Sequence, residues 1–368
     1  MKIVMTLMVR DEVDILRAML DHHLAEGVDF FIVTDNGSFD GTTEVLREYQ
    51  DRGVLELRSD PIHRKQQAPT VTAMARDAYS IYGADWVLNA DADEFWVARD
   101  PSITLRFALE NIPREIGSFP VPVVDMIGPP ALEGSGLSRL VYRDERPVDE
   151  LYRLGLLAHS TADVAHIGSP SVSVVQGNHF VDIPSTGLPA TAFELEVLHL
   201  PWRSWKQYSH KVRNAGRAYE ANPELTPSPN HHGMRDYRRL LAGSLFGWYL
   251  LRHPTDAQIA EGIAAGSLVE DRRLTGLRAP IADIAITDDS AQPQRELAAD
   301  AGRAIADLRL SEQREIELRD QLLGAWHRTD AAEAELSETK AALQAAKNRR
   351  VVRLADVVIN FFSRGRQK

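Results

Sequence analysis

Three acidic residues, Asp91, Asp93 and Glu94, directly follow a largely apolar segment at residues 84–90. Such a segment is typical of an interior strand of a parallel sheet, which is covered on both faces and lacks polar alternation. Carboxylates gathered at the end of that strand repel one another unless a cation lies between them. Hard oxygen ligands suit Mg²⁺ or Mn²⁺, so the Asp-Ala-Asp motif predicts a divalent-metal site. A solvated acidic turn is the alternative interpretation.

The residues before this motif alternate between strand-like and helical patterns. Strand-like runs lie at residues 2–9, 30–34, 54–57 and 85–90. Helical spacing of apolar residues occurs between these runs, and the alternation predicts an α/β fold with a doubly wound, mostly parallel sheet. Ligands bind such sheets at the carboxyl ends of the strands. Three polar loops fall there, at residues 10–12, 35–42 and 91–94.

Three motifs in these loops carry a family resemblance. They read Arg-Asp-Glu at residues 10–12, Asp-Asn-Gly-Ser-Phe-Asp-Gly-Thr at 35–42 and Asp-Ala-Asp-Glu-Phe at 91–95. Together they resemble family 2-type glycosyltransferases of the GT-A fold, in the branch whose first loop reads Arg-Asn-Glu. The sequence departs from that branch at Asp11, where Asn is usual, and at Asn89, a polar residue in a normally apolar strand.

The resemblance implies a nucleotide-diphosphate sugar donor and a bound Mn²⁺ or Mg²⁺, which would stabilise the charge that develops on the leaving diphosphate. Asp93 would bind this cation directly. Asp91 would contact the ribose, or the metal through water.

Several polar residues near the same strand ends are candidates for donor binding. Asp35 and Asn36 offer hydrogen bonds to a nucleobase or ribose, and Thr6 and Arg10 are expected where the base would lie. Capping of the following turn is the alternative for Asp35. Two further candidates, placed in a loop near the expected phosphates, are Lys65 and Gln66. A solvated loop would look the same there.

Two strand-like runs in the second half, 171–180 and 193–200, each carry a histidine near the carboxyl end. His199 opens the segment His-Leu-Pro-Trp-Arg-Ser, which is similar to His-x-Pro-x-Arg-Ser of the same branch. The resemblance therefore implies that His199 completes the metal shell and that Arg203 or Lys211 faces the diphosphate. A strand-end histidine that bonds a backbone carbonyl is the alternative.

His179 is the predicted catalytic base, because an inverting transfer needs one general base within hydrogen-bond reach of the acceptor hydroxyl. Asp182, Glu194 and Glu196 compete for this role, and no spacing rule decides among them. If the enzyme instead retains the anomeric configuration, a single acceptor base is not expected.

The remainder of the first 289 residues gives weaker signals. We expect a strand at 119–126 beside the core sheet, an exposed loop at 128–150 and a helix at 205–219. The predicted domain organisation is a GT-A-like catalytic domain over 1–289. Its two halves are a nucleotide-sugar and metal half at 1–100 and an acceptor half at 101–289.

The carboxyl-terminal segment differs in composition. Residues 290–348 are rich in Ala, Glu, Arg and Leu and predict one long helix. Three-four spacing through Leu308, Leu322 and Leu336 predicts a weak coiled coil and homo-oligomerisation, with a solvated spacer as the alternative. Residues 349–368 predict a basic amphipathic tail that contacts an anionic membrane surface, or else packs on the catalytic domain.

Composition narrows the functional class. The net charge of -11 over 368 residues argues against a general nucleic-acid binder. The chain has no cysteine, so disulfides are excluded. It opens with a strand and lacks a signal-peptide pattern, and its apolar runs are shorter than the roughly 20 residues of a membrane span. We therefore expect a cytoplasmic protein that is peripheral at the inner membrane face.

The predicted function is that of a metal-dependent glycosyltransferase acting on a saccharide or lipid-linked acceptor in polysaccharide or glycoconjugate synthesis. A uridine- or guanosine-based donor is expected. The first alternative is a nucleotidyltransferase, which should carry a Gly-rich basic loop after strand one, and none is visible at residues 8–12. The second is an inactive oligomeric scaffold, against which the intact metal motif counts.

Overall fold

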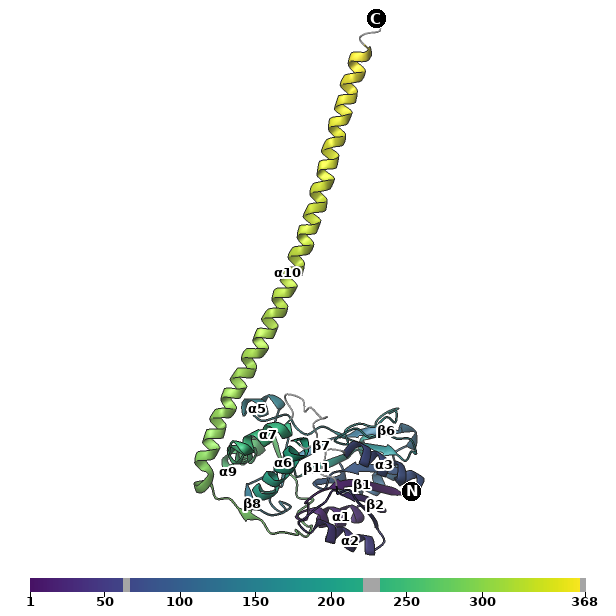
Figure 1. The fold of residues 1–368 in the computed structure, drawn as a ribbon, viewed down its shortest axis with the longest axis vertical. Helices are drawn as coiled ribbons and strands as arrows, with labels where there is room; N and C mark the ends of the chain where they lie inside the picture. Colours follow the sequence, from purple (N-terminus) through teal and green to yellow (C-terminus); the bar gives the residue numbers. More distant parts are fainter. Residues whose placement is uncertain (62–66, 221–231, 365–368) are drawn as a thin grey trace. The chain divides into compact units, whose positions relative to one another are not determined.

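The computed structural model describes residues 1–61, 67–220 and 232–364. The chain forms two compact units, Met1–Ala304 and Ile305–Lys368. The first unit contains the sheets and most of the helices (Figure 1). The long helix α10 (Asp288–Arg364) begins in the first unit and supplies the described part of the second.

The core of the first unit is a six-stranded sheet with the order β3-β2-β1-β4-β10-β6. Its strands are β1 (Ile3–Val9), β2 (Phe30–Asp35), β3 (Leu55–Ser59), β4 (Trp86–Ala90), β6 (Ser118–Val121) and β10 (Asp163–Ile167). The first four run parallel, and β10 is antiparallel to both of its neighbours. The sheet is therefore mostly parallel, as the sequence predicts.

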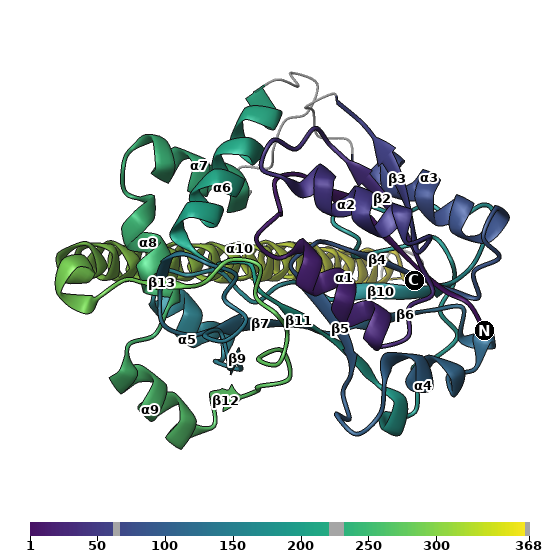
Figure 2. The ribbon, with the colours of Figure 1, turned by 90° about the horizontal axis from the view of Figure 1, so that it is seen from below.

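Both faces of this sheet are covered. Met5 and Leu7 of β1 share one apolar cluster with the helices α1 (Leu16–Ala25) and α2 (Thr42–Asp51). The alternate residue Val4 joins a second cluster with α3 (Gln67–Ser80), which lies against the other face (Figure 2). Successive side chains of a strand point to opposite faces, so β1 is buried from both sides. The α/β doubly wound fold class is confirmed.

A second sheet of five strands extends the first unit, with the order β12-β9-β7-β11-β5. Its strands are β5 (Glu94–Ala98), β7 (Val123–Ile127), β9 (Tyr142–Asp144), β11 (Leu195–His199) and β12 (Leu268–Glu270), and β8 (Ala131–Glu133) pairs separately with β13 (Ile284–Ala285). The register of β11 places His199 opposite Glu94 of β5 and Asp125 of β7. This register brings polar residues from three strands to one point.

Helix α6 (Trp205–Glu220) follows β11 and packs against the helices α7 (His232–Leu241) and α8 (Leu245–Arg252) through an apolar cluster. The approach to α7 is close at Gly216, where an added Cβ would lie 2.2 Å from a ring carbon of Tyr237. Glycine thus permits the contact that fixes α6. The remaining helices are α4 (Leu105–Glu110), α5 (Val148–Arg153), α9 (Asp256–Ala265) and the short turns η1 (Arg114–Ile116) and η2 (Thr191–Phe193).

Three expectations for the second half need correction. Residues 171–180 form no strand, and only an isolated bridge joins Val174 to Val181. The expected strand at 119–126 divides into β6 and β7, which belong to different sheets. The segment 128–150 is not an exposed loop, because it contains β8, β9 and several buried apolar side chains.

A buried polar chain crosses the centre of the core sheet. The Thr6 hydroxyl donates to Asn89 Oδ1 at 2.7 Å, and Asn89 Nδ2 lies 3.1 Å from His166 Nε2. His166 Nδ1 is 2.8 Å from the Ile167 carbonyl, which accepts its proton. This chain explains why β4 tolerates Asn89, because every polar group in it has a partner. Burial lowers the pKa of His166 to about 4.

We expect His166 to make the free energy of unfolding fall as the pH drops. Its folded pKa of about 4 lies below the usual value of 6.5, so the unfolded chain binds the proton more readily. The contribution is complete above pH 6.5 and decreases toward pH 4, by about 2 kcal/mol between pH 7.5 and pH 5. Urea unfolding of the parent and of His166→Gln at pH 7.5 and pH 5 measures this change in the free energy of unfolding. Equal pH dependence in the two proteins would contradict the assignment.

Candidate functional site

The carboxyl ends of β1, β2 and β4 open into a common cavity of about 240 Å³. It is lined by Arg10 after β1, Asn36 after β2 and Asp91 after β4. Helix α6 closes it with Lys211 and Asn214. Three donor-binding candidates from separate motifs therefore meet at one place, as expected for the carboxyl edge of a parallel sheet.

Asp91 is held by contacts on both its side chain and its backbone. Its Oδ1 accepts a hydrogen bond from Gln67 Nε2 at 3.0 Å, and its backbone N–H donates to Glu94 Oε2 at 2.7 Å. Burial and the nearby charge of Asp93 raise the pKa of Asp91. Burial and the charges of Asp163 and Asp91 also raise the pKa of Glu94 well above its usual range. The acidic motif is therefore a packed structure and not a solvated turn.

Asp93 is 1% exposed and lies among cations. Lys211 Nζ donates to Asp93 Oδ2 at 2.6 Å, and Arg203 Nη1 lies 3.3 Å from the same oxygen. Burial alone would raise the pKa of Asp93, but Lys211, His199 and Arg203 outweigh it and hold the pKa below its usual value. Within the described part of the chain, Asp93 Oδ1 is buried without a hydrogen-bond partner.

His199 ends β11 with both ring nitrogens near carboxylates. Its Nδ1 lies 3.0 Å from Asp125 Oδ1 and 3.2 Å from Ser160 Oγ, and its Nε2 lies 3.8 Å from Asp93 Oδ2. Burial would lower the pKa of His199, but the hydrogen bond to Asp125 and the charge of Asp93 raise it to about 9. Side chains, and not a backbone carbonyl, orient this histidine.

The chemistry of these residues fits a divalent cation. Carboxylate and imidazole ligands suit Mn²⁺, and Asp93 Oδ1 is a buried acceptor without a partner among the residues that the structure describes. Metal-binding histidines usually donate their other ring N–H to a carboxylate, which is the arrangement of His199 with Asp125. In residues 1–61, 67–220 and 232–364, however, no three His, Cys, Asp or Glu side chains are already gathered to hold a metal. Metal binding by Asp91, Asp93 and His199 stays a prediction.

Arg203 is fully buried and ties α6 to the loop after β1. Its Nε and Nη2 each lie 2.9 Å from Asp14, and Nη2 also donates to Glu12 at 2.5 Å. Burial raises the pKa of Glu12 to about 7, although the charges of Arg203 and Lys211 oppose this. Because its guanidinium is engaged by these acids, Arg203 has a structural task beside its predicted diphosphate contact, which stays a prediction.

Two nucleotide-binding candidates occupy structural positions. Thr6 is fully buried three residues before the end of β1 and donates to Asn89, so it does not lie at the strand tip. Asp35 accepts from the Ser38 N–H and hydroxyl and from the Thr43 hydroxyl. The capping interpretation therefore describes Asp35, whose two oxygens fix the turn and the start of α2. The expected strand at residues 2–9 ends where β1 ends, at Val9, so the placing of Thr6 at its tip was wrong.

Arg10 and Asn36 both line the cavity and contact each other. An Arg10 guanidinium N–H donates to the Asn36 carbonyl, and Asn36 Nδ2 donates to the Asp60 carbonyl at 2.9 Å. These contacts join the ends of β1, β2 and β3. The other two candidates, Lys65 and Gln66, lie outside the described residues, whereas the adjacent Gln67 lines the cavity.

His179 follows a tight turn in which Gly177 and Asn178 both have positive φ, 87° and 63°. A Cβ at Gly177 would lie 2.9 Å from the His179 ring, so glycine allows the ring to pack over the turn. His179 Nδ1 lies 3.1 Å from Oδ1 of the buried Asp163, and its side chain is 41% exposed. Burial lowers the pKa of His179, which favours a neutral imidazole.

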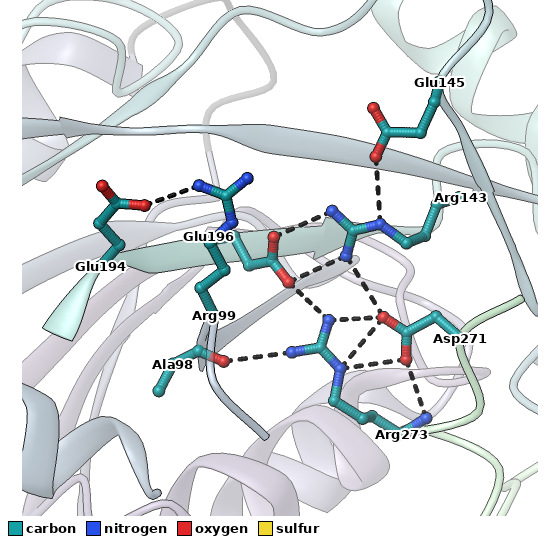
Figure 3. A network of polar contacts seen from close by, with 8 residues as sticks. All are labelled: Ala98, Arg99, Arg143, Glu145, Glu194, Glu196, Asp271 and Arg273. Carbon is teal, nitrogen blue, oxygen red and sulfur yellow. Dashed lines mark hydrogen bonds and ion pairs between the residues drawn. The ribbon is translucent and has the colours of Figure 1, made fainter. Parts of the chain in front are cut away.

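The competing bases are engaged elsewhere. Arg143 and Arg273 both bind the Glu196 carboxylate, at 2.9 and 2.5 Å (Figure 3). Burial would raise the pKa of Glu196, but the two arginines outweigh it and hold this pKa below its usual value. Glu194 pairs with Arg99 at 2.6 Å, also drawn in Figure 3. Asp182 accepts from the Ser173 N–H, which lowers its pKa. The role of His179 as the base stays a prediction.

Comparison with known proteins gives one family match. The family model described as Glycosyltransferase family 92 matches residues 4–119. This segment contains the three motifs and Asp91 and Asp93. The match supports the expectation of a glycosyltransferase enzyme, while the family 2-type branch stays a prediction. A search of curated proteins finds no match.

Solved structures show distant similarity. S. aureus TarS 1–349 in complex with UDP-GlcNAc has 11% identity and a TM-score of 0.35, over 85% of this chain and 92% of that chain. The chain spans 50% of a longer TarS structure, with 11% identity, a TM-score of 0.33 and coverage of 71% of this chain. Glucosyl-3-phosphoglycerate synthase from Mycobacterium tuberculosis, with Mn²⁺, UDP and glucosyl-3-phosphoglycerate, has 17% identity and a TM-score of 0.26, over 45% and 56% of the two chains.

Sequence reasoning missed several residues that shape the site. Asp125 and Asp163 orient the two candidate histidines, and Asp14 fixes Arg203. Asp125 follows no recognisable motif, and its position beside His199 is set by the register of β7 with β11. Only strand pairing could have identified it.

We expect Asp125→Asn to lower the pKa of His199 in the metal-free protein. The Asp125 carboxylate is the main contact that raises this pKa against burial, so its neutralisation should reduce the pKa by about one unit or more. NMR titration of the imidazole resonances measures the shift. Ser160→Ala is the matched control, because it removes a neutral hydroxyl that contacts both Asp125 and the same nitrogen and leaves the charge of Asp125 in place. An unchanged His199 pKa in Asp125→Asn would refute the electrostatic account.

Proposed function

We propose that this chain is a metal-dependent glycosyltransferase that moves a sugar from a nucleotide-diphosphate sugar to an acceptor hydroxyl. The observation that carries the proposal is the cavity lined by Arg10, Asn36, Asp91 and Lys211. Three of these four residues belong to the segment that matches a glycosyltransferase family. The cavity combines cations for phosphates with polar groups for a nucleoside.

The ends of β1 and β2 would receive the nucleoside. Arg10 and Asn36 line this part of the cavity and are fixed by their mutual hydrogen bond. The diphosphate would lie nearer to the end of β4 and α6, where Lys211 supplies a positive charge. Charge complementarity of this kind holds a leaving diphosphate as its negative charge grows.

Asp93 and His199, with Asp91, would hold the divalent cation. When bound, the cation would neutralise the negative charge that develops on the leaving diphosphate. The protein positions its ligands through the contact of Asp125 with His199 and that of Gln67 with Asp91. Such supporting contacts orient ligands and tune their affinity.

His179 would act as the general base of an inverting transfer. His179 Nδ1 lies 3.1 Å from Asp163 Oδ1. In the tautomer whose Nδ1–H donates to Asp163, Nε2 carries the lone pair that would take the proton of the acceptor hydroxyl. The acceptor oxygen then bonds the anomeric carbon, while the bond from that carbon to the diphosphate oxygen breaks. The nucleoside diphosphate leaves with the electron pair of that bond.

The acceptor is proposed to be a saccharide or a lipid-linked saccharide, in the synthesis of a surface polysaccharide or glycoconjugate. The donor nucleotide is proposed to be uridine- or guanosine-based. No helix among residues 1–61, 67–220 and 232–364 is long and apolar enough to cross a membrane. A cytoplasmic location and membrane contact by residues 349–368 stay predictions, and residues 365–368 lie outside the described part.

We expect UDP or GDP to raise the unfolding temperature in the presence of Mn²⁺, because a ligand that binds only the folded state stabilises it. Asp91→Asn should weaken this effect, since Asp91 lines the cavity. A thermal-shift screen with and without Mn²⁺ measures both. No response to any nucleoside diphosphate would contradict the proposed function and favour the scaffold.

His179→Gln serves as the matched control in the same experiment. It should bind the nucleotide like the parent, because His179 is assigned to the acceptor side. Its transfer rate should fall by about 10²-fold or more, the usual contribution of a general base. Parent-like transfer by His179→Gln would remove the residue from the mechanism.

The second unit is proposed to join two copies of the chain. Helix α10 exposes a stripe at three-four spacing that includes Leu308, Leu322, Leu336 and Leu343, of which Leu322 is 73% exposed. Burying a leucine contributes about 1.5–3 kcal/mol, and heptad spacing fits a coiled coil. The polar Ser311 and Glu315 interrupt the stripe, so the association should be weak.

We expect the full-length chain to be a dimer or higher oligomer in light scattering coupled to size exclusion. The double variant Leu322→Asp/Leu336→Asp should be a monomer, because buried charges oppose the coiled coil. Leu310→Asp is the control, since Leu310 is half-exposed and lies off the stripe. A monomeric parent, or an equal effect of both changes, would refute the coiled coil.

A further inference from the structure

Lys211 joins the buried carboxylate of Asp93 to the open cavity. Its Nζ lies 2.6 Å from Asp93 Oδ2, and its side chain is 40% exposed although Asp93 is 1% exposed. Lys211 also lines the cavity beside Asp91 and Arg10. Its ammonium therefore lies where a donor diphosphate and a cation-binding carboxylate would meet.

The other two positive groups near Asp93 are fixed. Arg203 is fully buried and held by Asp14 and Glu12. His199 is held through its Nδ1 by Asp125. Lys211 differs from both, because its flexible four-carbon stem reaches Asp93 from the cavity side. To leave Asp93, Arg203 would also have to break its contacts with Asp14 and Glu12, and His199 its contact with Asp125. Within the described part of the chain, Lys211 pairs with Asp93 alone, so its ammonium can move away more easily.

We propose that the Lys211 ammonium competes with the divalent cation for Asp93 and moves to the donor diphosphate when the donor binds. In the donor-free protein the ammonium neutralises Asp93 and keeps the cation weakly bound. The donor diphosphate offers Lys211 a second anionic partner, which releases the Asp93 oxygen. Cation and nucleotide then bind with positive coupling. This inference rests on the proposed function.

The competition follows from charge and distance. A divalent cation that approaches Asp93 meets the ammonium 2.6 Å from the same carboxylate oxygen, so like charges repel at short range. It also finds that oxygen already engaged in a charge-assisted hydrogen bond. Moving Lys211 to the diphosphate removes both obstacles. By linkage, the cation then strengthens nucleotide binding by the same factor.

Direct contact between a diphosphate and Mn²⁺ would also couple the two ligands, so coupling alone does not identify Lys211. The affinity for Mn²⁺ in the absence of nucleotide does identify the role of Lys211, because no phosphate is then present to bind the cation. Neutralising Lys211 removes the competing cation and leaves Asp93 and His199 in place. If Lys211 competes with the cation, replacing Lys211 by a neutral residue should make Mn²⁺ bind more tightly. Replacing a metal ligand would have the opposite effect.

The experiment is calorimetric titration of the full-length chain with Mn²⁺ alone, comparing the parent with Lys211→Met. We expect the variant to bind Mn²⁺ about tenfold more tightly, within the usual range of coupling between sites. UDP and GDP are then titrated with and without Mn²⁺, and the coupling factor should be smaller in Lys211→Met. Lys206→Met is the matched control, because Lys206 is an exposed lysine on α6 that pairs with Glu133.

Thermal unfolding of Lys211→Met and of a second neutral variant, Lys211→Gln, shows whether each is folded. Equal or weaker Mn²⁺ binding by a folded variant would overturn the role of Lys211. If the parent still binds UDP or GDP with Mn²⁺, the failure concerns Lys211 alone. If the parent binds neither nucleotide, the proposed function fails, whatever the Mn²⁺ affinity of the variants.

Discussion

The buried guanidinium of Arg203 holds the parts of the site together. It reaches Asp14 and Glu12 in the loop after β1 and lies 3.3 Å from Asp93 in the turn after β4. Removing one partner of such a buried group leaves an uncompensated charge, at a cost of about 3–5 kcal/mol. Glu12, Asp14 and Asp93 can lie close together because the guanidinium of Arg203, from the segment between β11 and α6, lies among them. The shape of the cavity at the ends of β1, β2 and β4 follows from this arrangement, since Glu12 and Lys211 both line it.

The acidic pair Asp91 and Asp93 meets positive groups from the second half of the chain. Asp91 and Asp93 belong to the segment that matches the glycosyltransferase family, whereas His199, Arg203 and Lys211 lie beyond it. The electrostatic balance of the cavity is thus a tertiary property. It also explains why the acidic motif is packed and not solvated, because positive groups from the second half neutralise it.

The two histidines are positioned by different means. His199 lies in a strand, and pairing with β7 sets its distance to Asp125. His179 follows a turn with two positive φ values, and contact with Asp163 sets its orientation. The rigid strand suits a group that would hold a cation at fixed geometry. The partly exposed turn suits the proposed role of His179, in which the ring would meet an acceptor from solvent.

The sequence alone determined the alternation of strands and helices, because apolar periodicity reports which faces are buried. It also located Arg10, Asn36 and Asp91, since residues that follow parallel strands must share one edge of the sheet. It located the end of β1 but not the task of Thr6, which is set by a hydrogen bond to Asn89 across the sheet. It also did not separate β6 from β7, which pair with different strands. The contacts of Asp125, Asp163 and Lys211 were decided by tertiary structure alone. They join residues 16 to 118 positions apart, and such pairs are fixed by strand register and helix packing, which leave no local pattern in the chain.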